Sequence, residues 1–246
     1  MAKRSPQKTK YKRILLKLSG EAFQNKETGH SLDIKAISKI ASQLKKAKAK
    51  GCEIAIVVGG GNIFRGGESL HIDRNTGDYM GMLSTVINCL ALQSSLEKME
   101  VPTRVMTAFP IPAVAEPFVR RKATRHLEKG RIVIFGAGTG NPYLTTDTAA
   151  ALRANETNCD LLIKGTKVDG IYTEDPVKNQ KAKRYQKIGY SEALSKELKI
   201  MDAAAFSLCK ENNLPIIVFN FFKQDEIIKV LDGKPVGTLV GGSDNG

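Results

Sequence analysis

The chain has 246 residues, with 41% hydrophobic and 26% charged side chains, a length and composition typical of a globular protein with one large α/β domain. No apolar run approaches the roughly 18 residues of a membrane span, and the basic N-terminus leads into a strand pattern rather than the apolar core of a signal peptide, so we expect a cytoplasmic protein. Lysine and arginine outnumber acidic residues by 38 to 25, and the formal charge of +13 favours polyanionic ligands, nucleotides as much as nucleic acids.

Cysteine and histidine are scattered along the chain. There is no C-x-x-C pair, so a zinc site or a Cys-His catalytic pair has little support. We expect free, buried thiols and histidines on the surface or in loops. The residues concerned are Cys52, Cys89, Cys159, Cys209, His30, His71 and His126. The sequence also lacks an RNP, KH or zinc-finger signature, so nucleic acid is not an expected partner.

Strand-like and helix-like segments alternate after a basic arm. The arm, residues 1–10, is expected to be disordered, and residues 11–246 are expected to form a single domain. Apolar runs predict strands at 13–18, 53–58, 103–107, 131–135, 160–164 and 215–219. Apolar residues at helical spacing predict helices at 34–47, 78–99, 119–129, 147–157, 202–213 and 224–231. The polar stretch 166–190 departs from this alternation and is expected to be a loop or small hairpin that serves a site.

This alternation predicts an α/β fold in which helices cover both faces of a mostly parallel sheet, a three-layer αβα sandwich. In such sheets, ligands bind outside the carboxyl ends of the strands. We therefore expect the functional residues at the ends of the first, second, fourth and fifth predicted strands.

The first strand ends in KLSG (17–20), and the second in GGGNIFRGG (59–67). A lysine next to a glycine is common in so basic a chain. Taken alone, Lys17 is therefore interpreted as a structural residue and not as a functional one. Three consecutive glycines let several backbone N–H groups approach an anion, and Arg65 can clamp phosphate oxygens. A flexible linker is the alternative, but the apolar sequence on both sides argues against it.

The fourth strand runs into GAGTGNPYLTTDT (136–148). This turn matches neither of two common phosphate-binding motifs. It is not G-x-G-x-x-G, because Asn141 stands where the third glycine is needed, and it is not a P-loop, because no G-K-[ST] follows. Helix capping explains Thr146 and Asp147 without a function, but it does not explain the glycines and the amide. The fifth strand ends in KGTKVDGIYTEDP (164–176), whose Asp-Gly and Asp-Pro pairs also fit an ordinary hairpin.

Together, the four strand ends supply lysines, an arginine, glycine-rich backbone, hydroxyl and amide groups, and carboxylates. Phosphoryl transfer between nucleotides needs positive charge and N–H donors around the moving oxygens, in-line placement of two substrates, and Mg²⁺ on the donor phosphates. It needs no covalent nucleophile from the protein. We therefore interpret the convergence as a site for two phosphate-bearing ligands.

Seven segments, in this order, resemble the bacterial-type uridylate (UMP) kinases of the amino acid kinase family. They are YKRILLKLSGEAF, VVGGGNIFRG, GDYMGMLSTVINCLALQ, GAGTGNPYLTTDTAAALRANE, LLIKGTKVDGIYTEDP, MDAAAFSLCKENNLPIIVFN and GTLVGG, and they span nearly all of residues 11–242. The resemblance implies that ATP and UMP give ADP and UDP, as in pyrimidine nucleotide biosynthesis, by direct in-line transfer in an αβα sandwich without a P-loop. It also implies a homohexamer.

By position, the resemblance implies a catalytic set of Lys17, Arg65 and Asp147, in which Lys17 neutralises the transferring phosphoryl group and Asp147 orders the lysine and metal environment. The implied ATP-binding residues are Lys17, Leu18, Ser19, Gly20, Gly61, Arg65, Thr166, Tyr172 and Asp175. The implied UMP-binding residues are Gly60, Asp78, Thr139, Gly140, Asn141, Pro142, Tyr143, Leu144, Thr145 and Thr146, with Gly60 by the phosphate and Asp78 on the ribose hydroxyls. ATP and Mg²⁺ are the implied cofactors, and no metal ligand is assigned.

The resemblance implies inhibition by UTP. Activation by GTP is not expected, because residues 23–30 are nondescript where many relatives have a GTP-linked loop, and Gln93 stands where some have arginine. Two alternatives stay open: a kinase of the same fold that phosphorylates a carboxylate or carbamate, and a nucleotide- or nucleic-acid-binding regulator that uses the basic arm.

Overall fold

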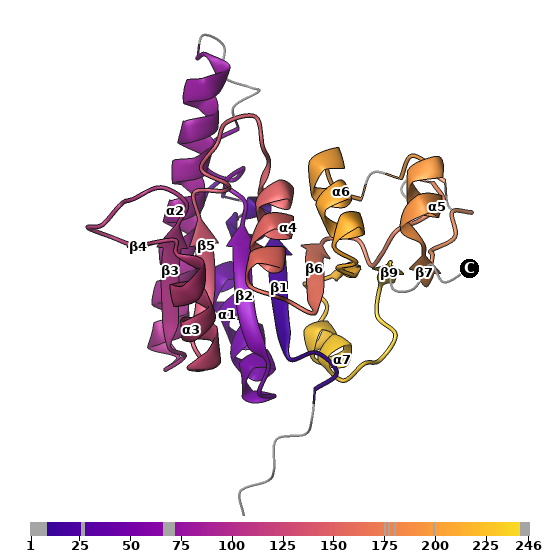
Figure 1. Ribbon diagram of the computed structural model, residues 1–246, viewed down its shortest axis with the longest axis horizontal. Helices are drawn as coiled ribbons and strands as arrows, with labels where there is room; N and C mark the ends of the chain where they lie inside the picture. Colours follow the sequence, from indigo (N-terminus) through magenta and orange to yellow (C-terminus); the bar gives the residue numbers. More distant parts are fainter. Residues whose placement is uncertain are drawn as a thin grey trace, which may run out of the picture.

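The computed structural model describes residues 9–25, 28–65, 72–174, 176, 178–179, 181–198 and 200–241. Within this part of the chain, nine strands form one sheet in the order β4-β3-β5-β2-β1-β6-β8-β9-β7 (Figure 1). All neighbouring strands are parallel except β8 and β9. The strands are β1 Arg13–Leu18, β2 Glu53–Val58, β3 Thr103–Thr107, β4 Glu116–Pro117, β5 Ile132–Gly136, β6 Leu161–Thr166, β7 Lys187–Ile188, β8 Ile216–Asn220 and β9 Thr238–Val240.

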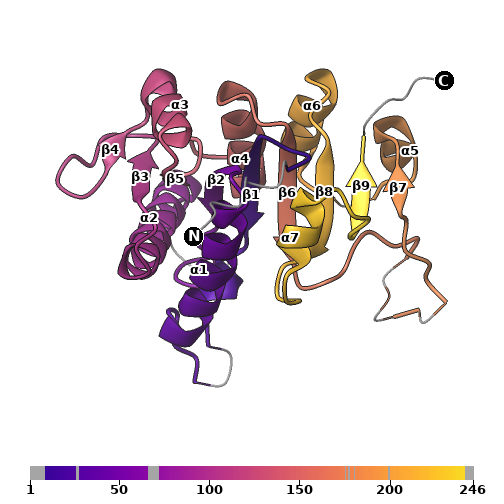
Figure 2. The same ribbon diagram turned by 90° about the horizontal axis from the view of Figure 1, so that it is seen from below.

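Helices cover both faces of the sheet (Figure 2). One layer holds α1 Ile34–Ala49, α2 Arg74–Lys98 and α7 Glu226–Leu231, and the other holds α3 Arg120–Glu128, α4 Thr146–Glu156, α5 Tyr190–Ser195 and α6 Ala203–Glu211. A 3-10 turn, η1 Gly20–Phe23, follows β1. The predicted three-layer αβα sandwich with a mostly parallel sheet is confirmed.

The central strands are apolar on both faces because each face lies under a helical layer. In β1, Ile14 and Leu16 pack in the core beneath α1 and α2, whereas Leu15 packs in the core beneath α4. This explains why the strand reads as a continuous apolar run instead of an alternating one. The sheet therefore forms a rigid base from which its carboxyl-end loops project.

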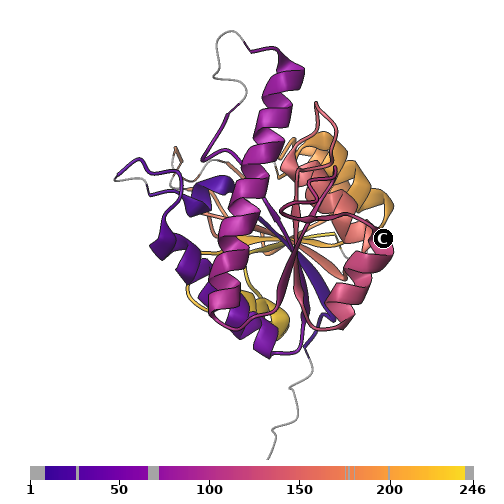
Figure 3. The same cartoon turned by 90° about the vertical axis from the view of Figure 1, so that its left-hand side faces the viewer.

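Every predicted strand and helix is present, and all ends lie within two residues of their predicted positions except the start of α2. That helix begins at Arg74 because the Asp73 carboxylate caps it by accepting from Thr76 N at 3.0 Å. Asp78, expected at the start of the helix, therefore lies one turn inside it. Figure 3 shows the first turns of α2 extending past the carboxyl ends of the strands.

Four short elements near the two ends of the sheet were not predicted: β4, β7, β9 and α5. The stretch 166–190 does form the expected hairpin, with Thr173 N donating to Lys183 O and Tyr185 N donating to Ile171 O, both at 2.9 Å. Residues 1–8 of the predicted arm lie outside the described residues. Lys10, its last residue, donates from its backbone N–H to Leu231 O at 2.9 Å.

The prediction of buried free thiols is confirmed for all four cysteines. Burial raises the pKa of the Cys89 thiol to about 12, which leaves it protonated and unreactive at neutral pH. The prediction for histidine is wrong at His126, which lies in α3 and hydrogen-bonds Glu116 at 3.1 Å and Arg131 at 2.8 Å. His30 is exposed in a loop as expected, and His71 lies outside the described residues.

Candidate active site

The four loops predicted to converge follow β5, β2, β1 and β6, which are consecutive neighbours in the sheet. Their carboxyl ends therefore meet at one edge, as a parallel sheet requires. Three cavities open there. The α2 cavity, about 160 Å³, lies between α2 and the loops after β2 and β5; the inner cavity, about 330 Å³, lies between the loops after β1 and β6; the hairpin cavity, about 600 Å³, lies beside residues 166–176.

Asp147 lies at the centre, in the first turn of α4, and holds two lysines from neighbouring strands. Its Oδ1 is 2.6 Å from Lys17 Nζ, and its Oδ2 is 2.7 Å from Lys164 Nζ. Lys17 and Asp147 each expose only 13% of the side chain. Burial alone would raise the pKa of the Asp147 carboxyl, but the two ammonium groups outweigh it and hold the pKa below its ordinary value. Asp147 is therefore a fixed anion that aligns two cations.

The triple-glycine loop after β2 is held by buried amide groups. Asn88 of α2 donates to Gly59 O at 2.7 Å and exchanges hydrogen bonds with Asn62 at 2.7 and 3.0 Å. Asn62 also donates to Ser31 O at 2.7 Å. A Cβ on Gly60 would lie 2.7 Å from Gly81 O and 2.9 Å from Ser84 Cβ, so only glycine fits there. The loop is thereby pressed against α2.

The loop after β5 rests on the same helix. Thr85 Oγ1 accepts from Ala137 N at 2.8 Å, where the backbone has a φ of 62°. Asp78 Oδ2 accepts from Tyr143 N at 2.7 Å, and the Asp78 side chain lines the α2 cavity. The helix α2 thus fixes both walls of this cavity.

Five of the predicted UMP-binding residues line the α2 cavity: Gly60, Asp78, Leu144, Thr145 and Thr146. The other five form the turn before it and are not among its lining residues: Thr139, Gly140, Asn141, Pro142 and Tyr143. Within that turn, Asn141 N donates to Thr139 Oγ1 at 3.1 Å.

The predicted ATP-binding residues divide between two adjoining cavities. Lys17 and Ser19 line the inner cavity, Tyr172 lines the hairpin cavity, and Thr166 lines both. Leu18 is buried, and Gly20 and Gly61 do not line either one, although Gly61 lines the α2 cavity. Arg65 pairs with Glu21 and donates to Gly61 O at 3.0 Å. Asp175 lies outside the described residues.

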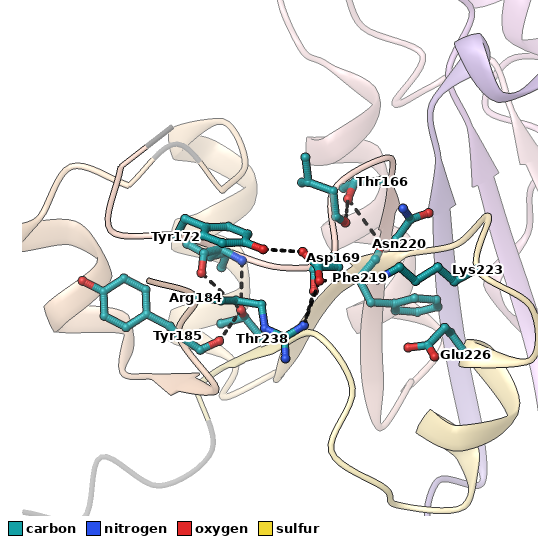
Figure 4. Close-up of polar contacts among 12 residues, drawn as sticks. Thr166, Asp169, Tyr172, Arg184, Tyr185, Phe219, Asn220, Lys223, Glu226 and Thr238 are labelled. Carbon is teal, nitrogen blue, oxygen red and sulfur yellow. Dashed lines mark hydrogen bonds and ion pairs between the residues drawn. The ribbon is translucent and has the colours of Figure 1, made fainter. Parts of the chain in front are cut away.

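The hairpin cavity is supported by a carboxylate that joins three segments. Figure 4 shows Asp169 between Tyr172, Arg184 and Lys223. Asp169 accepts from Tyr172 Oη at 2.6 Å and lies 3.2 Å from Arg184 and 3.4 Å from Lys223. The bond from Tyr172 lowers the pKa of Asp169 and in turn raises the pKa of the Tyr172 phenol. Both groups thus stay in the ionisation states that keep this bond at neutral pH.

Sequence reasoning missed several residues of the site. Lys164 begins the segment KGTKVDGIYTEDP, but no role was predicted for it. Nothing in its spacing distinguishes it from the other lysines of this basic chain. Thr85 and Asn88 had a usable signal, because polar residues interrupt the apolar positions of a long helix. Glu21, Lys167 and Asn62 had none.

Among the described residues, no group of three or more histidine, cysteine or acidic side chains is placed to hold a metal ion. No helix in this part of the chain combines the length and apolarity needed to cross a bilayer. The arrangement offers two lysines, held by one carboxylate, on the lining of the inner cavity, and this suits an anionic ligand there.

The sequence profile of the amino acid kinase family matches residues 12–220. The chain is similar to a UMP kinase from Bacillus anthracis, with 42% identity, a TM-score of 0.92, and coverage of 96% of this chain and 97% of that chain. It is similar to a UMP kinase from Ureaplasma parvum, with 40% identity, a TM-score of 0.88, and coverage of 94% and 99%. A uridylate kinase from Archaeoglobus fulgidus shares the fold at 22% identity, with a TM-score of 0.69 over 93% and 99% of the two chains.

Proposed function

The chain belongs to the amino acid kinase family, and on this premise we propose that it is a UMP kinase, a phosphotransferase that moves the γ-phosphoryl group of ATP to UMP and forms ADP and UDP. The observation that carries the proposal is the Lys17–Asp147–Lys164 cluster. Its two lysines line the inner cavity, and its carboxylate directly follows Thr146, which lines the α2 cavity. A cation held between two ligand cavities is what direct transfer between bound nucleotides requires.

In this mechanism, the donor phosphates bind in the inner cavity and the acceptor phosphate binds at Gly60 in the α2 cavity. Lys17 stabilises the charge on the phosphoryl group as it moves in line between them, and Arg65 holds donor oxygens. Asp147 keeps Lys17 and Lys164 in place. No covalent intermediate is required, because the acceptor phosphate attacks the donor phosphoryl group directly. Burial raises the pKa of all four cysteine thiols to about 12, so they are poor nucleophiles at neutral pH.

On the acceptor side, Asp78 accepts from the ribose hydroxyls of UMP, and the loop of residues 139–146 encloses the uracil. On the donor side, Thr166 and Tyr172 hold the adenosine in the hairpin cavity. Asp175, for which the resemblance implies the same role, lies outside the described residues. The position of Asp78 and Thr166 on the linings of separate cavities supports this division.

Magnesium fits this site as a companion of ATP. The Asp147 carboxylate is already paired with two lysines, so the described residues suit an ion held mainly by phosphate oxygens. When bound, the ion neutralises phosphate charge. The protein groups that share this task are Lys17, Lys164 and Arg65.

We further propose that residues 11–246 act as one kinase domain and that the protein is a homohexamer inhibited by UTP and not activated by GTP. The assembly is supported by an apolar stripe on the exposed side of α2, where Met80, Leu83 and Ile87 are 37%, 47% and 45% exposed. Sedimentation of the purified protein, and its turnover with each nucleotide added, test these statements.

A coupled assay of ADP release across UMP, CMP, AMP and acetylglutamate tests the function. UMP is expected to react far faster than the others, whereas preference for a carboxylate or carbamate would favour a different kinase of this fold. Lys17→Ala should lower turnover at least about 100-fold while the protein stays folded. A fully active alanine variant would remove Lys17 from its role.

A further inference from the structure

Glu21 joins three loops of the site through one carboxylate. It lies in η1, directly after β1. Its Oε1 pairs with the Arg65 guanidinium, from the loop after β2, and its Oε2 lies 2.5 Å from Lys167 Nζ, from the loop after β6. Each carboxylate oxygen therefore holds one cation.

Glu21 and Lys167 both line the inner cavity, together with Lys17 and Lys164. Among the residues that line this cavity, Glu21 is the one acid against three lysines. The three paired side chains are partly open to solvent, with Glu21 35%, Lys167 44% and Arg65 48% exposed. They are therefore able to exchange partners without disturbing the core.

Exposed ion pairs such as these stabilise a fold little, so stability is a weak reason for this arrangement. The bond from Lys167 lowers the pKa of Glu21 against the opposing effect of partial burial, and Arg65 adds to the lowering. The carboxylate is thus charged at neutral pH. It presents two anionic oxygens to two cations, as a phosphate group would.

We propose that Glu21 is an exchangeable counter-ion of the donor site: it neutralises Arg65 and Lys167 in the nucleotide-free protein, and the donor phosphates displace it. This inference rests on the proposed function and adds Lys167 to the residues that bind ATP phosphates. It also makes Glu21 a device for product release, because Glu21 competes again for both cations once the donor has lost a phosphoryl group.

Calorimetric titration with inorganic tripolyphosphate, and with the non-hydrolysable analogue β,γ-imido-ATP, tests the proposal. Glu21→Gln should bind both ligands about fivefold more tightly, because it frees two cations. Lys167→Ala should bind them about tenfold more weakly, and Lys167→Arg should stay near wild type. The opposite signs are the signature, since a merely structural role would weaken binding in both variants.

The remote pair Lys46–Asp225 supplies matched controls. Its atoms are 2.9 Å apart, and its side chains are exposed to a similar degree, 49% and 43%. Asp225→Asn and Lys46→Ala should bind tripolyphosphate as the wild type does, and thermal melting should show all variants folded.

Weaker or unchanged binding in Glu21→Gln, or unchanged binding in Lys167→Ala, would overturn the inference. UMP-dependent ADP formation by the wild type is measured in parallel. Its absence would remove the proposed function, whereas turnover combined with unaltered tripolyphosphate binding in the variants would remove only the role of Glu21 and Lys167.

Discussion

The two sides of the site are supported in different ways. On the α2 side, the loops after β2 and β5 are fixed by Asn88, Asn62 and Thr85, which are 0%, 7% and 2% exposed. On the hairpin side, the supporting group is Asp169, whose side chain is 33% exposed and whose partners lie near the surface.

This difference has an energetic meaning. A buried amide that loses its partner costs the full desolvation penalty, whereas an exposed ion pair is weak and can be rearranged. We therefore expect the α2 side to be a preformed cavity whose geometry is linked to global stability. The hairpin side should be adjustable, with binding affected before stability.

The largest expected effect lies between the two sides, at Asp147. Asp147→Asn leaves Lys17 and Lys164 without a buried counter-charge, so turnover should fall at least about 100-fold and the free energy of unfolding by about 3 kcal/mol. Steady-state assays and urea denaturation measure the two quantities. Turnover within twofold of wild type would show that neither side depends on this centre.

The same carboxylate predicts a pH dependence of stability. Because folding lowers the pKa of Asp147 from an ordinary value of 3.8, its contribution is complete above that value and is lost as the pH falls through the folded-state pKa. The stability difference between wild type and Asp147→Asn should accordingly shrink below about pH 4. Urea midpoints measured from pH 7 to pH 3 check this, and a constant difference would contradict it.

On the α2 side, Asn88→Ala removes the bond to Gly59 O and the donor to Asn62 Oδ1. We expect a loss of about 2 kcal/mol in the free energy of unfolding and about a tenfold lower kcat/KM for UMP. Asn155→Ala is the control, because the Asn155 amide donates to Ala151 O of its own helix. Equal effects of the two substitutions would mean that burial of Asn88 has no special consequence for the site.

On the hairpin side, Asp169→Asn should raise the KM for ATP about fivefold and change the free energy of unfolding by less than about 1 kcal/mol. Tyr172→Phe, which loses the same hydrogen bond, should act in the same direction. A stability loss as large as that of Asn88→Ala would remove the contrast between the two sides.

The smallest expected effect is at Gly81, a helical glycine whose added Cβ would meet nothing within 4 Å. Gly81→Ala should stabilise α2 by about 0.5–1 kcal/mol. Because Gly81 lines the α2 cavity, the methyl group should also raise the KM for UMP about threefold. Thermal melting and UMP saturation curves separate the two effects, and an unchanged KM would show that this part of the lining does not meet UMP.

The central strands, and the position of the site at their carboxyl ends, could be predicted from the sequence because both depend on local patterns. Buried strands such as β1 are continuous apolar runs, and glycines such as Gly60 mark close backbone approach. The edge elements β4 and β7 are too short to carry a pattern.

The resemblance implied that Asp147 orders the environment of Lys17, but spacing along the chain alone could not predict the pairs of the site. The cluster of Lys17, Asp147 and Lys164 depends on contacts between residues far apart in the chain, and spacing along the sequence contains no information about them. The same holds for Glu21 with Arg65 and Lys167. Asn88 and Thr85 had a recognisable signal in the sequence, because they are polar residues at apolar positions of a long helix.

The sheet also ends in a way that limits how molecules can associate. Both outermost strands, β4 and β7, are two residues long, and β4 contains Pro117, which has no N–H to donate. Such short rims give a foreign strand almost no template for hydrogen bonding, which protects a large sheet from edge-to-edge polymerisation. We therefore expect subunit contacts to use the side chains of helices and loops rather than the backbone of the edge strands.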